Sequence, residues 1–269
     1  MVNFISKKEL SLSNEFLKNG YLIKKISDDK ALSFIKKLFV KIITKKKEFK
    51  NLQDREIFDK THKYIKKNNL NDFRLNLINA LNNNKYFREN YFQCAKSLLD
   101  VIVGNELVMQ KKINLSIQLP KDSSSLLDVH ADVWSGDSPY EAVAWIPLVN
   151  CFKTKSMYIL PFSKYKKYEK NLFSKKVKNS QNLFNKIKKD VHWLDVKFGE
   201  ILIFNQCLPH GNVVNKTMET RWSMNCRFKS LFSPYNFKKF GEVFKPINIK
   251  PASLSGMNYR YPNKTDEDF

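Results

Sequence analysis

The chain has 269 residues, of which 42% are hydrophobic and 13% aromatic, and it contains only 7 Gly and 9 Pro. This composition supplies enough apolar side chains for a globular core and excludes a largely disordered or low-complexity protein. No Gly-, Ser- or Pro-rich linker and no internal repeat divides the sequence. We therefore expect a single domain over residues 1–269.

The chain is strongly basic, with 48 Lys and Arg against 26 Asp and Glu, a formal net charge of +22. Such a charge can attract nucleic acid, an anionic membrane or a phosphorylated substrate. The lysines, however, occur in small separate groups, and no zinc-finger or RNA-recognition signature is present. The pattern favours lysines on solvated faces, and a phosphorylated substrate, a nucleic acid or a membrane surface remain alternative explanations.

Four cysteines, at positions 94, 151, 207 and 226, show no CxxC pair and no metal-site spacing. In a chain of this length they indicate reduced thiols rather than a disulfide framework. The N-terminus lacks the apolar segment of a signal peptide, and nowhere do 18 apolar residues run together. We therefore expect a cytoplasmic protein without a membrane span.

The first part of the chain, residues 1–105, has mainly helical patterning. The run Ser27-Asp28-Asp29 offers N-cap chemistry before an apolar stripe at helical spacing. The stripe consists of Ala31, Leu32, Phe34, Ile35, Leu38 and Phe39. Further helices are predicted over residues 54–67, 71–81 and 86–103, the last ending at Gly104.

After Gly104 the pattern changes to short apolar or alternating runs, which are typical of strands. These runs cover residues 107–110, 113–119, 126–134, 142–149, 157–160, 192–196, 201–204, 210–214 and 220–228. A basic, partly helical insertion is predicted at 164–190, and a C-terminal tail at 247–269. Many short strands favour a sandwich or barrel. We therefore predict an α+β chain with a jelly-roll (double-stranded β-helix) core over residues 106–246 and the N-terminal helices packed against it.

Three residues suggest a metal site. In a strand, residues i and i+2 point to the same face, so His130 and Asp132 would lie side by side. His210 follows 80 residues later, in a predicted strand of its own. Two histidines and one carboxylate form the facial triad of non-heme iron(II) oxygenases, which leaves positions open for a cosubstrate and O2. The His-x-Asp spacing alone arises often by chance. The two other histidines, His62 and His192, are expected to be structural or at the surface.

The strand predicted at 220–228 alternates in character. One face carries Arg221, Ser223, Asn225 and Arg227, and the other carries Thr220, Trp222, Met224, Cys226 and Phe228. Such a strand could turn its polar face into a barrel, where an arginine and a serine can hold a carboxylate. The alternation fits equally well an edge strand whose polar face lies in water.

Several segments resemble a known enzyme family. They are HADVWSGDSP from His130, WIPL from Trp145, KSMYILP from Lys155, NKT from Asn215 and ETRWSMNCRFKSLFSPY from Glu219. Together they resemble the 2-oxoglutarate oxygenases of sporadic carbohydrate-biosynthesis clusters, within the broader phytanoyl-CoA dioxygenase-like group. The resemblance covers roughly residues 106–246. The chain departs from the broader group at residues 156–163, where that group usually has an Asn-Gly-rich turn and a Pro-Gly-Ser-His segment.

The resemblance implies an iron(II)- and 2-oxoglutarate-dependent dioxygenase in which His130, Asp132 and His210 bind the iron. Arg221, 11 residues beyond His210, matches the position that binds the C5 carboxylate of 2-oxoglutarate. Ser223 would add a hydrogen bond, and Arg227, with a less suitable spacing, is the alternative clamp. Trp145 stands where the group often has a tryptophan, which can contact the cosubstrate or pack in the core.

The implied cofactor is Fe(II), with 2-oxoglutarate and O2 as cosubstrates. The implied reaction is oxidation, usually hydroxylation, of a C–H bond in a small molecule, by family context a sugar or nucleotide-activated sugar in carbohydrate biosynthesis. Two other classes remain open: a non-catalytic jelly-roll carbohydrate-binding protein, and a basic nucleic-acid-binding protein. The second would explain the charge but leave the metal triad and Arg221 as coincidence.

Overall fold

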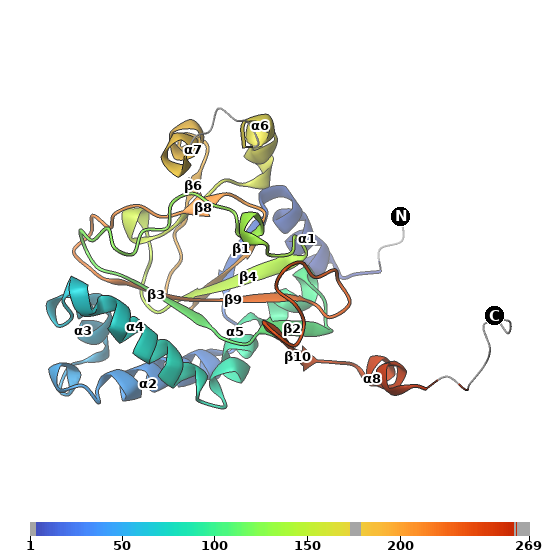
Figure 1. Ribbon diagram of the computed structural model, residues 1–269, viewed down its shortest axis with the longest axis horizontal. Helices are drawn as coiled ribbons and strands as arrows, with labels where there is room; N and C mark the ends of the chain where they lie inside the picture. Colours follow the sequence, from blue (N-terminus) through green and yellow to red (C-terminus); the bar gives the residue numbers. More distant parts are fainter. Residues whose placement is uncertain (1–3, 173–178, 261, 263–269) are drawn as a thin grey trace.

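The computed structural model describes residues 4–172, 179–260 and 262. They form a seven-stranded antiparallel sheet with helices against one face and a three-stranded sheet across the other (Figure 1). The order of the large sheet is β1 (Tyr21–Lys25), β7 (Glu200–Asn205), β4 (Glu141–Pro147), β9 (Arg221–Ser230), β2 (Leu107–Gln110) and β10 (Phe244–Asn248), and β3 (Asn114–Gln118) also pairs with β9. The small sheet has the order β6 (His192–Trp193), β5 (Tyr158–Ile159) and β8 (His210–Gly211).

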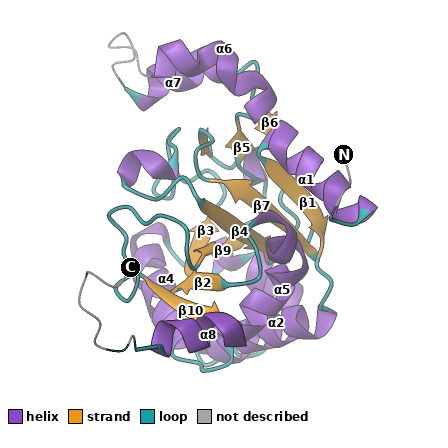
Figure 2. Cartoon of the chain, turned by 90° about the vertical axis from the view of Figure 1, so that its right-hand side faces the viewer, coloured by secondary structure: helices purple, strands orange, loops and turns teal. Residues whose placement is uncertain are grey.

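The helices fall into separate groups (Figure 2). The N-terminal helices are α1 (Lys7–Asn19), α2 (Asp29–Ile43), α3 (Asp54–Asp59), α4 (Lys67–Asn82) and α5 (Phe87–Ile102). The predicted insertion forms α6 (Phe162–Leu172) and α7 (Ser180–Ile187), which stand over the small sheet; its residues 173–178 lie outside the described residues. In the tail, α8 (Pro251–Asn258) extends away from the body of the protein. No helix in the described part of the chain is both long and apolar enough to cross a membrane.

The helix predicted after residues 27–29 is confirmed as α2. Of the three candidate caps the structure uses Asp28, whose carboxylate accepts from the backbone N–H of Ala31 at 2.9 Å. The single helix predicted over 54–67 is wrong, because α3 ends at Asp59. There the Asp59 carbonyl accepts from the backbone N–H of Thr220 at 2.7 Å, and a 3-10 turn, Thr61–Lys63, follows. A tertiary contact from the start of β9 therefore ends this helix.

Two other expectations need correction. The run 126–134 does not form a strand: His130 makes an isolated bridge with His210, and a 3-10 turn, Asp132–Ser135, begins two residues later. Tyr21–Lys25, in the part expected to be helical, is the edge strand β1 paired with β7. Helix α1 ends before it at Gly20, whose φ of 78° is left-handed, and a Cβ there would lie 2.5 Å from the Leu208 side chain. Glycine meets both requirements.

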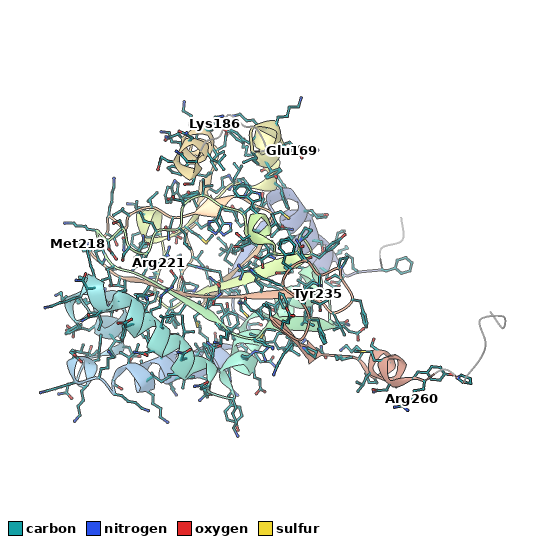
Figure 3. The ribbon with its side chains drawn as sticks, in the orientation of Figure 1. Glu169, Lys186, Met218, Arg221, Tyr235 and Arg260 are labelled. Carbon is teal, nitrogen blue, oxygen red and sulfur yellow. The ribbon has the colours of Figure 1, made fainter. Side chains whose placement is uncertain are left out.

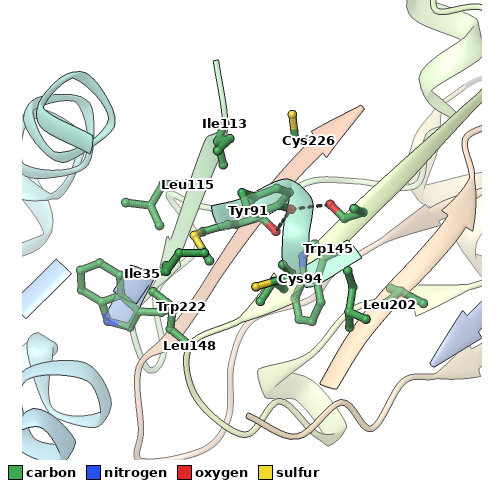
Figure 4. Packing of buried hydrophobic residues seen from close by; sticks show 14 of the residues in the cluster. Ile35, Tyr91, Cys94, Ile113, Leu115, Trp145, Leu148, Leu202, Trp222 and Cys226 are labelled. Atoms are coloured by element: carbon green, nitrogen blue, oxygen red, sulfur yellow. Dashed lines mark hydrogen bonds between the residues drawn. The ribbon is translucent and has the colours of Figure 1, made fainter. Parts of the chain in front are cut away.

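The core lies between the large sheet and the N-terminal helices. The apolar face of β9, predicted by its alternation, is fully buried there. Trp222 packs edge-on against Phe39, Phe58 and Phe73 from three helices, and its Nε1 donates to Thr61 Oγ1 at 2.8 Å. Nearby the Tyr91 hydroxyl donates to the Ala144 carbonyl at 2.7 Å (Figure 4). Both polar atoms are thus satisfied inside the core.

We predict that Trp222→Ala lowers the free energy of unfolding by about 3–5 kcal/mol, because it empties a ring site shared by three helices. Chemical denaturation measures this difference. Phe232→Ala is the control, since Phe232 is 63% exposed and its loss should change stability by no more than about 0.5 kcal/mol. Equal effects of the two substitutions would contradict the proposed role of Trp222 in the core.

Candidate metal and carboxylate site

The structure brings together the three residues that the sequence pointed to. One ligand atom from each of His130, Asp132 and His210 lies within 4.8 Å of the other two. The two imidazole rings have centroids 4.3 Å apart, and His130 Nε2 is 3.8 Å from Asp132 Oδ1. Two imidazoles and a carboxylate therefore face a common point.

The backbone sets this arrangement. His130 and His210 exchange N–H···O hydrogen bonds of 2.9 and 2.8 Å. Ala131 is extended, with φ −121° and ψ 135°, so the side chains of His130 and Asp132 still project to the same side although no strand continues. The sequence predicted that a strand would place these two side chains on the same side, whereas in the structure a single extended residue does so.

Both rings are oriented by backbone carbonyls. His130 Nδ1 lies 2.7 Å from the Asp128 carbonyl oxygen, and His210 Nδ1 lies 2.9 Å from that of Leu208. A carbonyl only accepts, so each Nδ1 donates a hydrogen bond, and Nε2 is the ring nitrogen left to face the cluster. Burial lowers the pKa of His210 to about 4, and the Asp132 carboxylate only partly opposes this shift. His210 is therefore neutral at pH 7, the form that binds metals.

Gly211, next to His210, is required by close packing. A Cβ at this position would lie 2.6 Å from the Tyr158 hydroxyl oxygen and 2.8 Å from the backbone oxygen of Leu127. Both distances are shorter than a carbon atom tolerates, and the second involves backbone. Any larger residue would displace the strand that carries His210.

Arg227 takes a position that the sequence did not predict. Its Nη2 is 3.1 Å from Asp132 Oδ1, and its Nε is 3.4 Å from Asp137 Oδ1. Asp137 is also held by Lys238, at 2.6 Å. Arg227 thus holds the carboxylate of the metal cluster in place. The sequence contains no spacing signal for this contact, because Arg227 lies in strand β9 and both carboxylates come from the distant loop between β3 and β4.

Arg221 is buried, at 3% exposure, and none of its contacts in the described structure is with a carboxylate. Its Nη2 donates to Ser116 Oγ at 2.9 Å, whereas its Nε has no partner. The hydroxyl oxygens of Ser156 and Ser223 are likewise buried without partners. Burial lowers the pKa of Arg221, with Cys151 partly opposing this shift. An unpaired buried cation flanked by unused donors is a site suited to an anion.

One cavity of about 280 Å³ joins Arg221 to the His-Asp-His cluster. It is lined by His130, Asp132 and His210 as well as by Arg221 and Arg227. Trp145 lines the same cavity and belongs to the hydrophobic core, so both of its expected roles are compatible with its place. Figure 3 shows Arg221 in the interior, between the two sheets.

The two remaining histidines lie outside the cluster. His62 Nδ1 is 3.0 Å from Thr220 Oγ1, and His192 Nδ1 is 2.8 Å from the Tyr21 hydroxyl oxygen. These contacts agree with structural or surface roles.

The sequence matches no protein-family model and no curated protein. Its structure is similar to solved non-heme enzymes. A nickel complex of the non-heme monooxygenase ThoJ has a TM-score of 0.55 at 13% identity, covering 94% of this chain and 89% of ThoJ. HygX from Streptomyces hygroscopicus, with nickel and 2-oxoglutarate bound, has a TM-score of 0.54 at 10% identity, covering 89% and 91%.

SnoK, a non-heme alpha-ketoglutarate-dependent carbocyclase from nogalamycin biosynthesis, has a TM-score of 0.54 at 12% identity, covering 91% of this chain and 97% of SnoK. At these identities the similarity establishes the fold. The chain therefore has the mixed helix and antiparallel-sheet fold of these enzymes. The narrower resemblance, to the phytanoyl-CoA dioxygenase-like group and its carbohydrate-cluster members, stays a prediction.

We predict that Arg227→Lys weakens binding of a divalent metal by about tenfold, because the ammonium keeps the charge but loses the planar fork that orients Asp132. Titration with Mn(II), followed by electron paramagnetic resonance of the free ion, measures this. Arg55→Lys is the control, since the Arg55 side chain is 86% exposed and lines a different cavity. Unchanged Mn(II) affinity in Arg227→Lys would show that Asp132 does not need this partner.

Proposed function

We propose that the protein is an iron(II)- and 2-oxoglutarate-dependent oxygenase built on a jelly-roll core. The observation that carries the proposal is the sharing of one cavity by a His-Asp-His cluster and a buried arginine without an anionic partner. HygX, which has the same fold, binds nickel and 2-oxoglutarate. Iron, 2-oxoglutarate and O2 are the cofactor and cosubstrates proposed here.

The three ligands suit iron. Two imidazoles whose Nε2 atoms face one point, together with one carboxylate, form the set that non-heme iron enzymes use, and three protein ligands leave open positions. His130, Asp132 and His210 would hold the metal, with Arg227 fixing the carboxylate. When bound, iron supplies the activation of O2, which converts 2-oxoglutarate into succinate and CO2 and places the second oxygen atom on a C–H carbon of the substrate.

The groups around Arg221 suit the far carboxylate of 2-oxoglutarate. The guanidinium offers a charged, planar donor, and the hydroxyls of Ser223 and Ser156 are unused donors beside it. A carboxylate there would pair a cation that now has only neutral partners. Arg221 is therefore our choice for the clamp. Arg227, the alternative, is already engaged with Asp132 and Asp137.

The apolar lining would keep water away from the reacting atoms. Val143, Trp145, Met157 and Phe204 contribute the hydrophobic wall of the cavity. A dry wall strengthens the electrostatic contacts inside it and limits side reactions. Trp145 would then serve by packing at the cavity wall.

The proposed substrate is a small molecule, by resemblance a sugar or nucleotide-activated sugar, and hydroxylation is the proposed outcome. SnoK and SnoN, an epimerase, show that enzymes of this fold also carry out other reactions. A non-catalytic carbohydrate-binding protein has no evident need for a metal cluster facing a buried unpaired arginine. A nucleic-acid-binding role leaves the same cavity without a purpose.

We predict that Asp132→Ala abolishes metal binding and 2-oxoglutarate-dependent succinate formation while the protein stays folded. The fold should survive because Arg227 keeps Asp137 and Gln206 as partners. Metal retention, succinate release and circular dichroism would be measured, with the exposed Asp72→Ala as control. Succinate formation at the parent rate in Asp132→Ala would mean that the wrong carboxylate has been chosen.

We predict that Arg221→Ala weakens 2-oxoglutarate binding by about 30- to 4,000-fold, equivalent to about 2–5 kcal/mol for a desolvated charged partner. Arg221→Lys should recover part of the loss, since it keeps charge without the fork. Titration of 2-oxoglutarate into anaerobic, iron-loaded protein, followed by its metal-to-ligand charge-transfer band, measures the affinity.

The matched comparison is Arg227→Lys, which should weaken metal binding rather than the clamp. Metal affinity should hardly change in Arg221→Ala, because Arg221 is no ligand. If Arg227→Lys impairs 2-oxoglutarate binding at saturating metal and Arg221→Ala does not, the two arginines have been assigned the wrong way round.

A further inference from the structure

The cavity that contains the His-Asp-His cluster and Arg221 is called the metal cavity below. A second cavity, of about 500 Å³, lies beside it. The two share Asn114, Leu127 and Asn225 as lining residues. Asn114 Nδ2 donates to Asn225 Oδ1 at 3.1 Å across the β3–β9 pair. The two cavities therefore meet at a pair of amide side chains, and we call the second one the outer cavity.

The metal cavity is small for its expected contents. It measures about 280 Å³ and would have to hold 2-oxoglutarate as well as the reacting carbon. Pockets for small molecules usually measure roughly 300–1,000 Å³. Most of a substrate larger than a few carbons would therefore lie in the outer cavity.

The outer cavity has a mixed apolar and polar lining, and both charged side chains in it are positive. One wall is the first half of α4, with Lys67, Asn71 and Arg74, and the loop after β3 adds Ser124 and Ser125. No carboxylate of the described residues lines it. Hydroxyl and amide groups there can bind a polar substrate, and the cations can bind an anion.

Arg74 is the cation that has no acidic partner in the described structure. Its Nη2 donates to Asn71 Oδ1 at 2.8 Å, a neutral acceptor. Lys67 differs, because its Nζ lies 3.6 Å from Asp122 Oδ1. The half-buried guanidinium of Arg74 is thus the group free to take an anion.

A third cavity shows that a cation without an acidic partner does not simply follow from the high net charge of the chain. Its cations are Lys36, Arg55 and Lys155, and each is paired with a carboxylate. The pairs are Lys36–Asp54 at 3.0 Å, Arg55–Asp59 at 3.7 Å and Lys155–Glu219 at 2.6 Å. That cavity is balanced in charge, whereas the outer cavity keeps an excess of positive charge.

We propose that the outer cavity binds the distal part of the substrate and that this part carries an anionic group, a phosphate or a carboxylate, held by Arg74. The inference rests on the proposed function for its geometry, since it places the reacting carbon at the metal and the anion away from it. The Asn114–Asn225 pair would contact the polar middle of the molecule. Arginine suits this role because its planar fork binds phosphate and carboxylate oxygens in pairs.

Calorimetric titrations of the full chain, at fixed ionic strength and with and without Mn(II) and 2-oxoglutarate, test the anion site. The probes are inorganic phosphate, glucose, glucose 6-phosphate and glucuronate, which separate phosphate from carboxylate and both from a neutral sugar. We expect glucose 6-phosphate or glucuronate to bind more tightly than glucose. Arg74→Gln should weaken the binding of that anion at least tenfold, and Arg74→Lys should keep part of the affinity.

Arg55→Gln is the matched control, an arginine in the charge-balanced cavity, and should leave anion binding unchanged. The proposal is overturned if no probe shows Arg74-dependent binding, if glucose binds as well as its anionic counterparts, or if Arg55→Gln weakens them as much. The last result would mean non-specific attraction to a basic surface.

Orientation is tested by paramagnetic relaxation with Mn(II) and 2-oxoglutarate bound. The Mn(II)–nucleus distances derived from the relaxation rates should be shorter for the sugar protons far from the phosphate of glucose 6-phosphate than for its phosphorus nucleus. The reverse order would overturn the placement of the anion. Failure of the protein to retain Mn(II) would instead count against the proposed oxygenase, and the calorimetry without metal would still decide the role of Arg74.

Discussion

The candidate site depends on two backbone hydrogen bonds exchanged by His130 and His210. They join a loop to strand β8 across 80 residues of sequence and fix the two rings with centroids 4.3 Å apart. Because the bonds are made by peptide groups, they need no particular side chain, and the imidazoles are free to face the cavity. The extended residue Ala131 then brings the Asp132 carboxylate beside the two rings. The contacts of Gly211 and Arg227 adjust the positions of these groups, which the bridge between the two histidines determines.

Strand β9 contributes both to the stability of the fold and to the orientation of the side chains in the candidate site. Its apolar face anchors three helices through Trp222, and its polar face presents Arg221 and Arg227 to the cavity. Since side chains alternate along a strand, a shift of one residue would exchange the two faces completely. Burial of the apolar face therefore also determines where both arginines point.

Sequence could predict what depends on local pattern. The alternation of β9, the cap of α2 and the residue types of the metal cluster were all visible in it. It could not predict the end of α3, because a hydrogen bond from Thr220 decides it. The run 126–134 has the apolar character of a strand, yet only His130 finds a strand partner. The different contacts of Arg221 and Arg227 were also hidden, since the acids that engage Arg227 come from the loop between β3 and β4.

The arginines of the two cavities differ in what they can reach. Arg227 is paired with Asp132 and Asp137, so it is placed to orient the Asp132 carboxylate rather than to bind a further anion. Arg221 is enclosed at 3% exposure and has unused donors beside it, which suits an anion that enters deeply and stays small. Arg74 is only half-buried and lines the larger cavity. Under the proposed function, two anions of different size would be separated by cavity volume, because the cavity that Arg221 lines measures about 280 Å³ and the outer cavity about 500 Å³. Burying the Arg221 guanidinium without an anionic partner costs free energy. An anion that fits the cavity recovers this free energy on binding, which favours it over an anion that does not fit.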